Sequence, residues 1–117
     1  MAGADNCLFC GIVAKKIPAT IVVESNQSIA FRDINAKAPV HVLVIPKEHI
    51  DNLMALEPRH RDALWDIHET IQQVARAEGA SENGFRVAVN NGKDAGQAVG
   101  HLHYHVLAGR KLSWPPG

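Results

Sequence analysis

The sequence has no long hydrophobic run, no excess of charge of either sign and only two cysteines. No apolar stretch approaches the roughly 20 residues of a transmembrane helix. The first ten residues, MAGADNCLFC, lack the basic start and the extended apolar segment of a secretory signal. We therefore expect a cytoplasmic protein that makes no contact with a membrane.

The charge balance and the cysteine count exclude two further classes of protein. Lys+Arg and Asp+Glu both number 12, so the formal net charge is zero. Without a basic excess, neither nucleic acid nor a membrane surface is an expected partner. Two cysteines are too few for the disulfide framework of a small secreted domain. In a reducing compartment they are expected to be thiols or metal ligands.

The composition is that of an ordinary globular domain. The chain has 117 residues, of which 46% are hydrophobic and 21% are charged. This predicts a single domain over residues 1–117, with a short C-terminal tail at 110–117. Residue patterns predict strands at 20–24, 28–33, 40–46, 84–92 and 101–109, a long helix at 58–79 and a short helix at 8–17. This order favours an α+β fold with an antiparallel meander sheet of about five strands.

The stretch HLHYHVL (101–107) contains three of the seven histidines. Side chains alternate between the two faces of a strand, so His101, His103 and His105 are expected on one face and the apolar residues between them on the other. Three titratable imidazoles on one face predict a functional cluster. The residues alone leave two explanations open. The histidines bind zinc, or one imidazole attacks a substrate while its neighbours orient it and move protons.

Two further patterns point to ligands. Glycines punctuate the stretch NNGKDAGQAVG (90–100) before the histidines, and glycine lets backbone amides approach an anion such as phosphate. A surface turn is an equally good explanation of that stretch. Cys7 and Cys10 form a C-x2-C pair, whose two thiolates can chelate one zinc ion. Closing a tetrahedral site needs two more ligands, and two free thiols are the alternative.

The histidine stretch also fits the pattern that defines the histidine-triad (HIT) superfamily: His, apolar, His, apolar, His, apolar, apolar. The segments IPATIVVES, AFRDINAKAPVHVLVIPKEHI, FRVAVNNGKDAGQAVGHLHYHVLAGR and WPPG are similar to the Hint branch, the histidine-triad nucleotide-binding proteins. The similarity extends over nearly the whole chain in consistent order. It implies a HIT-like fold and a hydrolase that binds purine nucleotides.

This resemblance assigns roles to four histidines. His103, in the middle of the triad, is the implied nucleophile, which attacks the α-phosphorus of an adenosine 5′-phosphoramidate. Water then releases the purine nucleoside monophosphate from the nucleotidyl-histidine. His101 and His105 are implied to orient the nucleophile and to contact the phosphate or the leaving group, with His41 beside the phosphate. No metal is required for this catalysis.

The resemblance also implies a nucleotide-binding site. Its expected members are Phe31, Asp33, Ile34, Leu43, Asn90, Gly96, Gln97, Ala98, His103 and His105. Asp33 is expected to bind the ribose hydroxyls, and Phe31, Ile34 and Leu43 to form apolar walls for the base, although core packing is an equally natural role for these three. Many Hint proteins have Ser where this chain has Ala98, which brings the efficiency of phosphoramidate cleavage into question.

A zinc site and a homodimer are implied as well. By resemblance, His49 and His101 complete a structural zinc site with Cys7 and Cys10. The strand near Phe85–Asn90 has no obvious covering segment, and an uncovered edge favours pairing with a second copy. Trp65 is a candidate contact, with core packing as the alternative. By resemblance, Trp114 crosses to the partner's nucleotide site.

The sequence therefore predicts a purine nucleoside phosphoramidase. Two other functions stay open. The protein is a nucleotide-binding module with vestigial hydrolysis, for which Ala98 is the supporting feature, or it is a zinc-dependent hydrolase that uses the triad as metal ligands.

Overall fold

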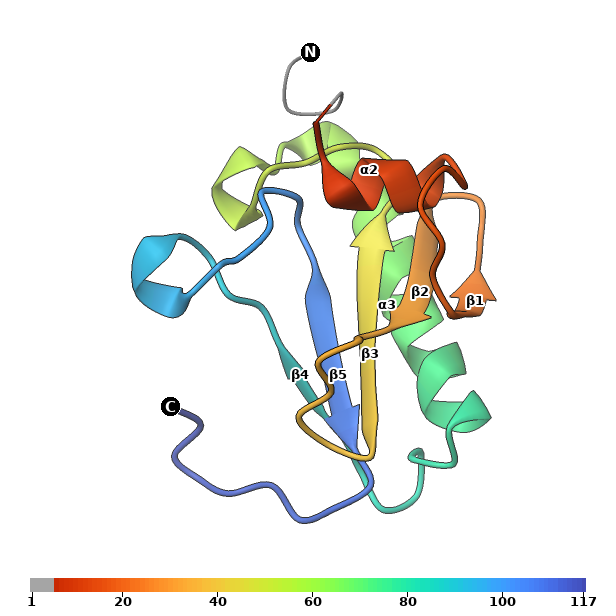
Figure 1. The fold of residues 1–117 in the computed structure, drawn as a ribbon, viewed down its shortest axis with the longest axis vertical. Coiled ribbons are helices and arrows are strands. Elements are labelled where there is room, and N and C mark those ends of the chain that lie inside the picture. Colours follow the sequence, from red (N-terminus) through yellow and green to blue (C-terminus); the bar gives the residue numbers. More distant parts are fainter. Residues whose placement is uncertain (1–5) are drawn as a thin grey trace.

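An antiparallel sheet of five strands forms the centre of the computed structural model, which describes residues 6–117 (Figure 1). The first five residues of the predicted domain lie outside the described part. The strands are β1 (Ile21–Glu24), β2 (Ser28–Arg32), β3 (Val40–Pro46), β4 (Arg86–Ala88) and β5 (Tyr104–Ala108). With one long and one short α-helix, this arrangement confirms the predicted α+β class.

The long helix follows the predicted apolar stripe. One 3-10 turn, η2 (Pro58–His60), opens the segment, and α3 (Arg61–Ala77) continues it. The short helix α2 (Leu8–Val13) ends four residues earlier than the predicted 8–17. The amides of Lys16 and Ile17 both donate to the carbonyl of Gly11, so the chain folds back over the helix. A Cβ at Gly11 would lie 2.4 Å from the Ile17 side chain, so glycine permits this close return. In the described part, no helix is both long and apolar enough to span a membrane.

The strand order is β1-β2-β3-β5-β4. The first three strands form a meander, α3 then leads to β4 at the outer edge, and β5 returns between β3 and β4. This order places the histidine strand in the interior of the sheet. His41 of β3 is paired with Leu107, and Leu43 is paired with His105.

Each face of the sheet is covered by a different helix. On the α3 face, Ile67, Ile71 and Val74 of the helix pack with Ala30, Val42, Val44, Leu102, Tyr104 and Val106. The prediction that the apolar residues between the histidines face the core is therefore confirmed. On the other face, α2 contributes Phe9 and Ile12 to a second cluster with Ile29, Phe31, Leu43 and Ile45. Alternation along β3 and β5 therefore directs His41 and His105 away from α3.

Two predicted strands are shorter in the structure by several residues. β5 begins at Tyr104 rather than at 101, because the Leu102 amide donates to the carbonyl of Ile50 (2.7 Å), outside the sheet. His101 and His103 therefore precede the strand. β4 covers only 86–88 of the predicted 84–92, and beyond it the side chain of Asn91 accepts a hydrogen bond from the amide of Leu53. That contact draws the chain away from the sheet edge.

Candidate active site and metal centre

A cleft of about 990 Å³ opens on the face of the sheet opposite α3. Residues from α2, the β2–β3 connection and the histidine stretch line it. The predicted site residues among them are Phe31, Asp33, Ile34, His41, Leu43, Asn90, Ala98, His103 and His105. The fold thus gathers most of the predicted nucleotide and catalytic residues around one cavity.

His103 is held in one orientation by the backbone. Only 6% of the residue is exposed, and its Nδ1 lies 2.8 Å from the carbonyl oxygen of His101. Because a carbonyl only accepts hydrogen bonds, Nδ1 carries the proton and donates it. The neutral ring therefore has its lone pair on Nε2. That is the tautomer a nucleophilic imidazole requires.

His41 and His105 form a hydrogen-bonded pair beside His103. The distance from His41 Nε2 to His105 Nδ1 is 2.9 Å, and Asp33 Oδ2 lies 3.4 Å from the same His41 nitrogen. The Lys37 amide donates to His41 Nδ1 at 3.0 Å. Burial lowers the pKa of His41, and burial with the adjacent imidazoles lowers that of His105 to about 4. Both rings are therefore neutral near pH 7.

His105 Nε2 has no partner. It is the one buried side-chain nitrogen or oxygen in residues 6–117 without a hydrogen bond. A buried polar atom without a partner costs free energy, and such atoms in native proteins commonly serve a ligand or a reaction. His105 lines the cleft, and its ring centroid lies 5.1 Å from that of His103.

The residues predicted to surround the sugar and base differ in exposure. Asp33 Oδ1 accepts a hydrogen bond from the amide of Asn35 (2.8 Å), which holds the carboxylate at the start of the β2–β3 connection. Ile34 is 96% exposed, so core packing does not account for it. Phe31 and Leu43 are buried in the cluster under α2 and also line the cleft.

The predicted phosphate loop uses many of its polar groups internally. The Gln97 side chain accepts from the amide of Gly92 (2.9 Å) and donates to the carbonyl of Asp51 (2.8 Å). The amides of Gly96 and Gln97 donate to carbonyls of the same loop. Ala98 lines the cleft, whereas Gly96 and Gln97 are not among its lining residues. Phosphate binding by these residues remains a prediction.

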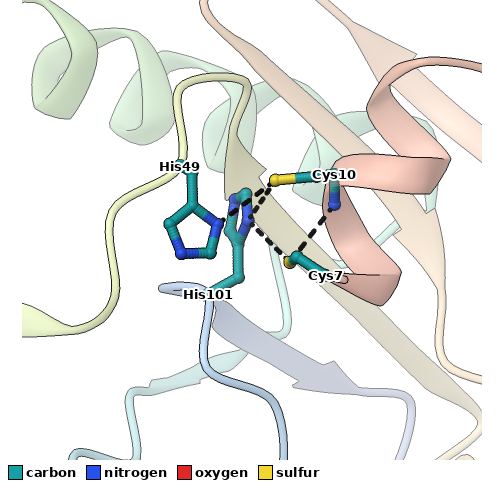
Figure 2. Close-up of side chains that lie close together, drawn as sticks. All are labelled: Cys7, Cys10, His49 and His101. Atoms are coloured by element: carbon teal, nitrogen blue, oxygen red, sulfur yellow. Dashed lines mark hydrogen bonds between the residues drawn. The ribbon is translucent and has the colours of Figure 1, made fainter. Parts of the chain in front are cut away.

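The four predicted zinc ligands meet at one end of the sheet (Figure 2). Cys7 and Cys10 come from the start of α2, His49 follows β3, and His101 precedes β5. Cys10 Sγ lies 3.2 Å from His49 Nδ1 and 3.5 Å from His101 Nδ1, and Cys7 Sγ lies 3.4 Å from His101 Nδ1. All four ligand atoms lie within 4.8 Å of one another.

The surroundings of this cluster suit a zinc ion. His49 Nε2 donates to Asp51 Oδ1 (2.8 Å), and His101 Nε2 donates to the carbonyl of Pro46 (2.9 Å). Each neutral imidazole therefore directs its Nδ1 lone pair at the sulfurs. Acceptors on the outer ring nitrogen orient metal-bound histidines in the same way. Burial raises the pKa of the Cys10 thiol to about 11, and the neighbouring thiol adds to the shift. A bound cation would favour the thiolates and relieve this cost.

Two features of the site were not predicted from the sequence. Phe9, between the two cysteines, lines the cleft and packs edge-on against His103 and Phe31, with centroid distances of 5.3 and 5.4 Å. Its only signal was its place in an apolar pattern. The second feature is the Lys37 amide, and a backbone group carries no signal in a sequence.

Comparisons with known proteins agree with this geometry. A model of the HIT domain matches residues 14–112. Adenylylsulfatase HINT1 of Arabidopsis thaliana is 43% identical over 112 residues, which are 94% of this chain and 76% of that protein. The 14 kDa zinc-binding protein of Brassica juncea is also 43% identical, over 94% of this chain and 98% of that protein. The crystal structure of a HIT family hydrolase from Legionella pneumophila superposes with a TM-score of 0.93 at 45% identity, covering 96% of this chain and all of that one.

The fold and the site together define a small α+β protein with a histidine-lined cleft on one face of an open sheet. The chain belongs to the HIT domain family.

Proposed function

We propose that this protein is a purine nucleotide hydrolase that cleaves adenosine 5′-phosphoramidates through a nucleotidyl intermediate on His103. The observation that supports this most directly is the His103 tautomer, because the hydrogen bond to the His101 carbonyl leaves a lone pair on Nε2. The name of the Legionella relative, a HIT family hydrolase, supports the class of reaction, and that of the Arabidopsis relative, an adenylylsulfatase, supports an adenylyl substrate.

The reaction proceeds in two steps. His103 Nε2 attacks the α-phosphorus, the P–N bond to the leaving group breaks, and its electron pair stays on the leaving nitrogen, which takes a proton from solvent. Water then attacks the same phosphorus, and the electron pair of the bond to His103 returns to Nε2. The attacking water loses one proton. Over both steps one water is consumed, and an amine and a nucleoside monophosphate are formed.

The cleft suggests how the nucleotide lies. The base is expected against Phe31, Leu43 and the exposed Ile34, because apolar walls favour a planar ring. The Asp33 carboxylate is placed to accept hydrogen bonds from ribose hydroxyls. The phosphate then lies beside His103, with Asn90 and His105 within the same cleft.

We further propose that Cys7, Cys10, His49 and His101 hold a structural zinc ion. Four protein ligands would close the coordination shell, so the metal would join α2 to the ends of β3 and β5 without offering an open position for substrate. The printed name of the Brassica relative, a zinc-binding protein, supports this.

Catalysis is expected to need no metal. A metal on His41 Nε2 would require the proton of the neutral ring to lie on Nδ1. That nitrogen lies 3.0 Å from the amide nitrogen of Lys37, which directs its own proton at it, so two donors would oppose each other. This geometry disfavours a metal ion on His41. The alternative in which the triad histidines bind a catalytic zinc ion is tested by turnover after chelation.

Ala98 supports a second substrate class. Its methyl group lines the cleft at the position where many Hint proteins have a hydroxyl donor. An amine leaving group must gain a proton, whereas sulfate leaves as a stable anion. Adenylyl sulfate, which the name of the Arabidopsis relative indicates, would therefore depend less on a donor at this position.

We also propose a homodimer formed through the β4 edge. β4 has one neighbouring strand, Val87 on it is 40% exposed, and Phe85 just before it is also exposed. Trp65 on α3 is 59% exposed, so core packing does not explain this tryptophan. An unpaired edge with apolar neighbours favours pairing with a second copy. Light scattering at micromolar concentration should report twice the chain mass of 12.7 kDa, and a monomer would refute the dimer.

The decisive test of the hydrolase is trapping of the intermediate. The protein is mixed briefly with an adenosine 5′-phosphoramidate or with adenylyl sulfate, quenched, and examined by mass spectrometry. An adenylyl adduct on the peptide that contains His103, together with release of AMP, is the expected result. AMP binding without an adduct or product from either compound would establish the binding module instead.

A further inference from the structure

The Lys37 amide determines the position of a proton on His41. An amide N–H is only a donor, and it lies 3.0 Å from His41 Nδ1. That nitrogen must therefore present a lone pair, which leaves the proton of the neutral ring on Nε2. The groups that face Nε2 are consistent with a proton there. Asp33 Oδ2, at 3.4 Å, is an acceptor, and His105 Nδ1, at 2.9 Å, can accept a hydrogen bond.

The same reasoning extends to His105. Since His41 Nε2 donates, His105 Nδ1 must accept, and the proton of the neutral His105 ring lies on Nε2. This is the buried nitrogen that has no partner in residues 6–117. A backbone amide thus produces, two imidazoles away, a single unsatisfied N–H donor in the cleft beside the nucleophile.

The residue that carries this amide is anchored, through its own carbonyl, to the segment that follows the histidine strand. Arg110 Nη2 donates to the carbonyl of Lys37 at 2.9 Å. Gly109, with a φ of +93°, lies so close to Pro39 that a Cβ on the glycine would be 2.8 Å from the proline ring. Pro39 and Lys37 belong to the connection between β2 and β3. The strand that carries His105 is therefore followed directly by the residues that hold the Lys37 loop.

We propose that the backbone amide of Lys37 is a positioning group which, through His41, keeps the proton of His105 on Nε2 and so supplies a hydrogen-bond donor to the substrate's phosphoryl group. Arg110 helps to position this amide by holding the carbonyl of the same residue. A donor oriented before the substrate arrives stabilises charge on the phosphoryl oxygens without reorganisation. The group that accepts this hydrogen bond is the phosphoryl group of the substrate, so the inference rests on the proposed function.

The sharpest test replaces the Lys37 amide with an ester by incorporating the α-hydroxy acid analogue of lysine. This change removes the N–H and keeps the side chain. Lys37→Ala is the matched control for proton position, because it removes the side chain and keeps the N–H. Each protein, loaded with zinc and labelled with ¹⁵N at histidine, is examined by NMR to identify which ring nitrogen of His41 and His105 carries the proton. Turnover of an adenosine 5′-phosphoramidate is measured alongside.

The unmodified protein and Lys37→Ala are expected to show protonated Nε2 and bare Nδ1 in both rings. The ester should shift both rings toward the opposite tautomer and lower kcat by about 10- to 100-fold, with KM changing much less. An ester variant with unchanged tautomers would overturn the inference, whatever its activity. So would altered tautomers with an unchanged kcat, because the donor would then serve no purpose in the reaction.

Failure of the proposed function would look different. If the unmodified protein did not turn over either adenylyl substrate, the hydrolase would be refuted, while the NMR comparison would still decide whether the amide sets the protons. A second variant avoids the ester altogether. Arg110→Ala should shift the tautomers in the same direction and lower kcat a few-fold, whereas the neighbouring Lys111→Ala should change neither. If the two variants had the same tautomers and the same kcat, Arg110 would have no part in positioning the amide.

Discussion

Two groups of side chains that could hold a metal ion occur within residues 6–117, and each has its ligand atoms within 4.8 Å of one another. One consists of Cys7, Cys10, His49 and His101, and the other of Asp33, His41 and His105. They differ in what the outer nitrogens of their imidazoles contact. In the first group these nitrogens face acceptors, Asp51 and the carbonyl of Pro46. In the second, the outer nitrogen of His41 faces a donor, the amide of Lys37.

This difference favours a different chemistry for each group. An outer acceptor draws the imidazole proton outward and leaves a lone pair directed inward, which a metal ion can use. An outer donor leaves the proton directed inward, which suits a hydrogen-bond donor for a substrate. His103 links the two groups, since it donates to the backbone of His101 and its ring lies 5.1 Å from that of His105. Similar residue types thus support opposite roles a short distance apart.

The largest expected effect is at the residue between the groups. His103→Ala should lower turnover by roughly 10³-fold or more, because no other group can form the covalent intermediate, while AMP affinity changes little. His105→Ala should lower kcat less, because it removes a donor and not the nucleophile. Steady-state kinetics and calorimetric titration with AMP test both variants. Near-native hydrolysis by His103→Ala would show that the mechanism is wrong.

The second prediction is that only the group with the two cysteines binds a metal ion. Elemental analysis of protein prepared without chelators should find about one zinc per chain. Cys10→Ser should lose the metal and much of the stability toward urea, whereas Asp33→Asn should keep the metal. Turnover should survive chelation for as long as the fold does. A stoichiometry of two, or loss of zinc from Asp33→Asn, would mean that the second group also binds metal.

The third prediction concerns pH and uses His105. Its pKa is about 4 in the folded protein, against an ordinary value of 6.5 in the unfolded chain, and burial is the main cause. As pH falls from 6.5 to 4, the unfolded state gains this proton and the folded state does not, so the free energy of unfolding decreases. Above pH 6.5 the ring contributes no pH dependence. Urea unfolding across this window should be less pH-dependent in His105→Asn than in the natural protein. If the free energy of unfolding depended on pH equally in both proteins, the prediction would be contradicted. Titration of the zinc ligands does not affect this comparison, because both proteins have the same zinc ligands.

A smaller effect is expected at Ala98. Ala98→Ser restores a hydroxyl to the cleft and should raise phosphoramidate turnover several-fold, with little change for adenylyl sulfate, whose leaving group needs no donor. The ratio of kcat/KM for the two compounds measures this. A serine variant with an unchanged ratio would show that the hydroxyl does not act on the leaving group here.

The smallest effect is predicted for the tail. Trp114 is 77% exposed, and it is held by Arg86, which lies 5.5 Å from the ring centroid and donates to the carbonyl of Ser113. Because the tail buries little surface, deleting residues 114–117 should leave the urea midpoint nearly unchanged. In the proposed dimer it should still alter selectivity among leaving groups by a few-fold. An unchanged substrate profile would mean that the tail does not reach the partner's site.

Much of the fold followed from periodicity. The apolar stripe of α3 and the alternation of HLHYHVL identified the core, because burial requires a repeat that matches the helix or strand. The limits of β4 and β5 did not follow, since they depend on hydrogen bonds to distant loops. The Ile50 carbonyl accepts from the amide of Leu102, and the Leu53 amide donates to the side chain of Asn91. Gln97 belongs to the predicted nucleotide site, and its binding of phosphate stays a prediction. Its side chain closes its own loop, a use that no local pattern indicated.

The sequence by itself determined which side chains are candidates for the chemistry: three histidines two residues apart, a C-x2-C pair, and His41 in an apolar strand. Residue type and spacing are sufficient for that, because a strand places alternate residues on one face. Only the tertiary structure decided where the protons lie. They are set by the carbonyls of Pro46 and His101 and by the amide of Lys37. Backbone groups are nearly the same in every residue, so their positions become known only when the chain has folded.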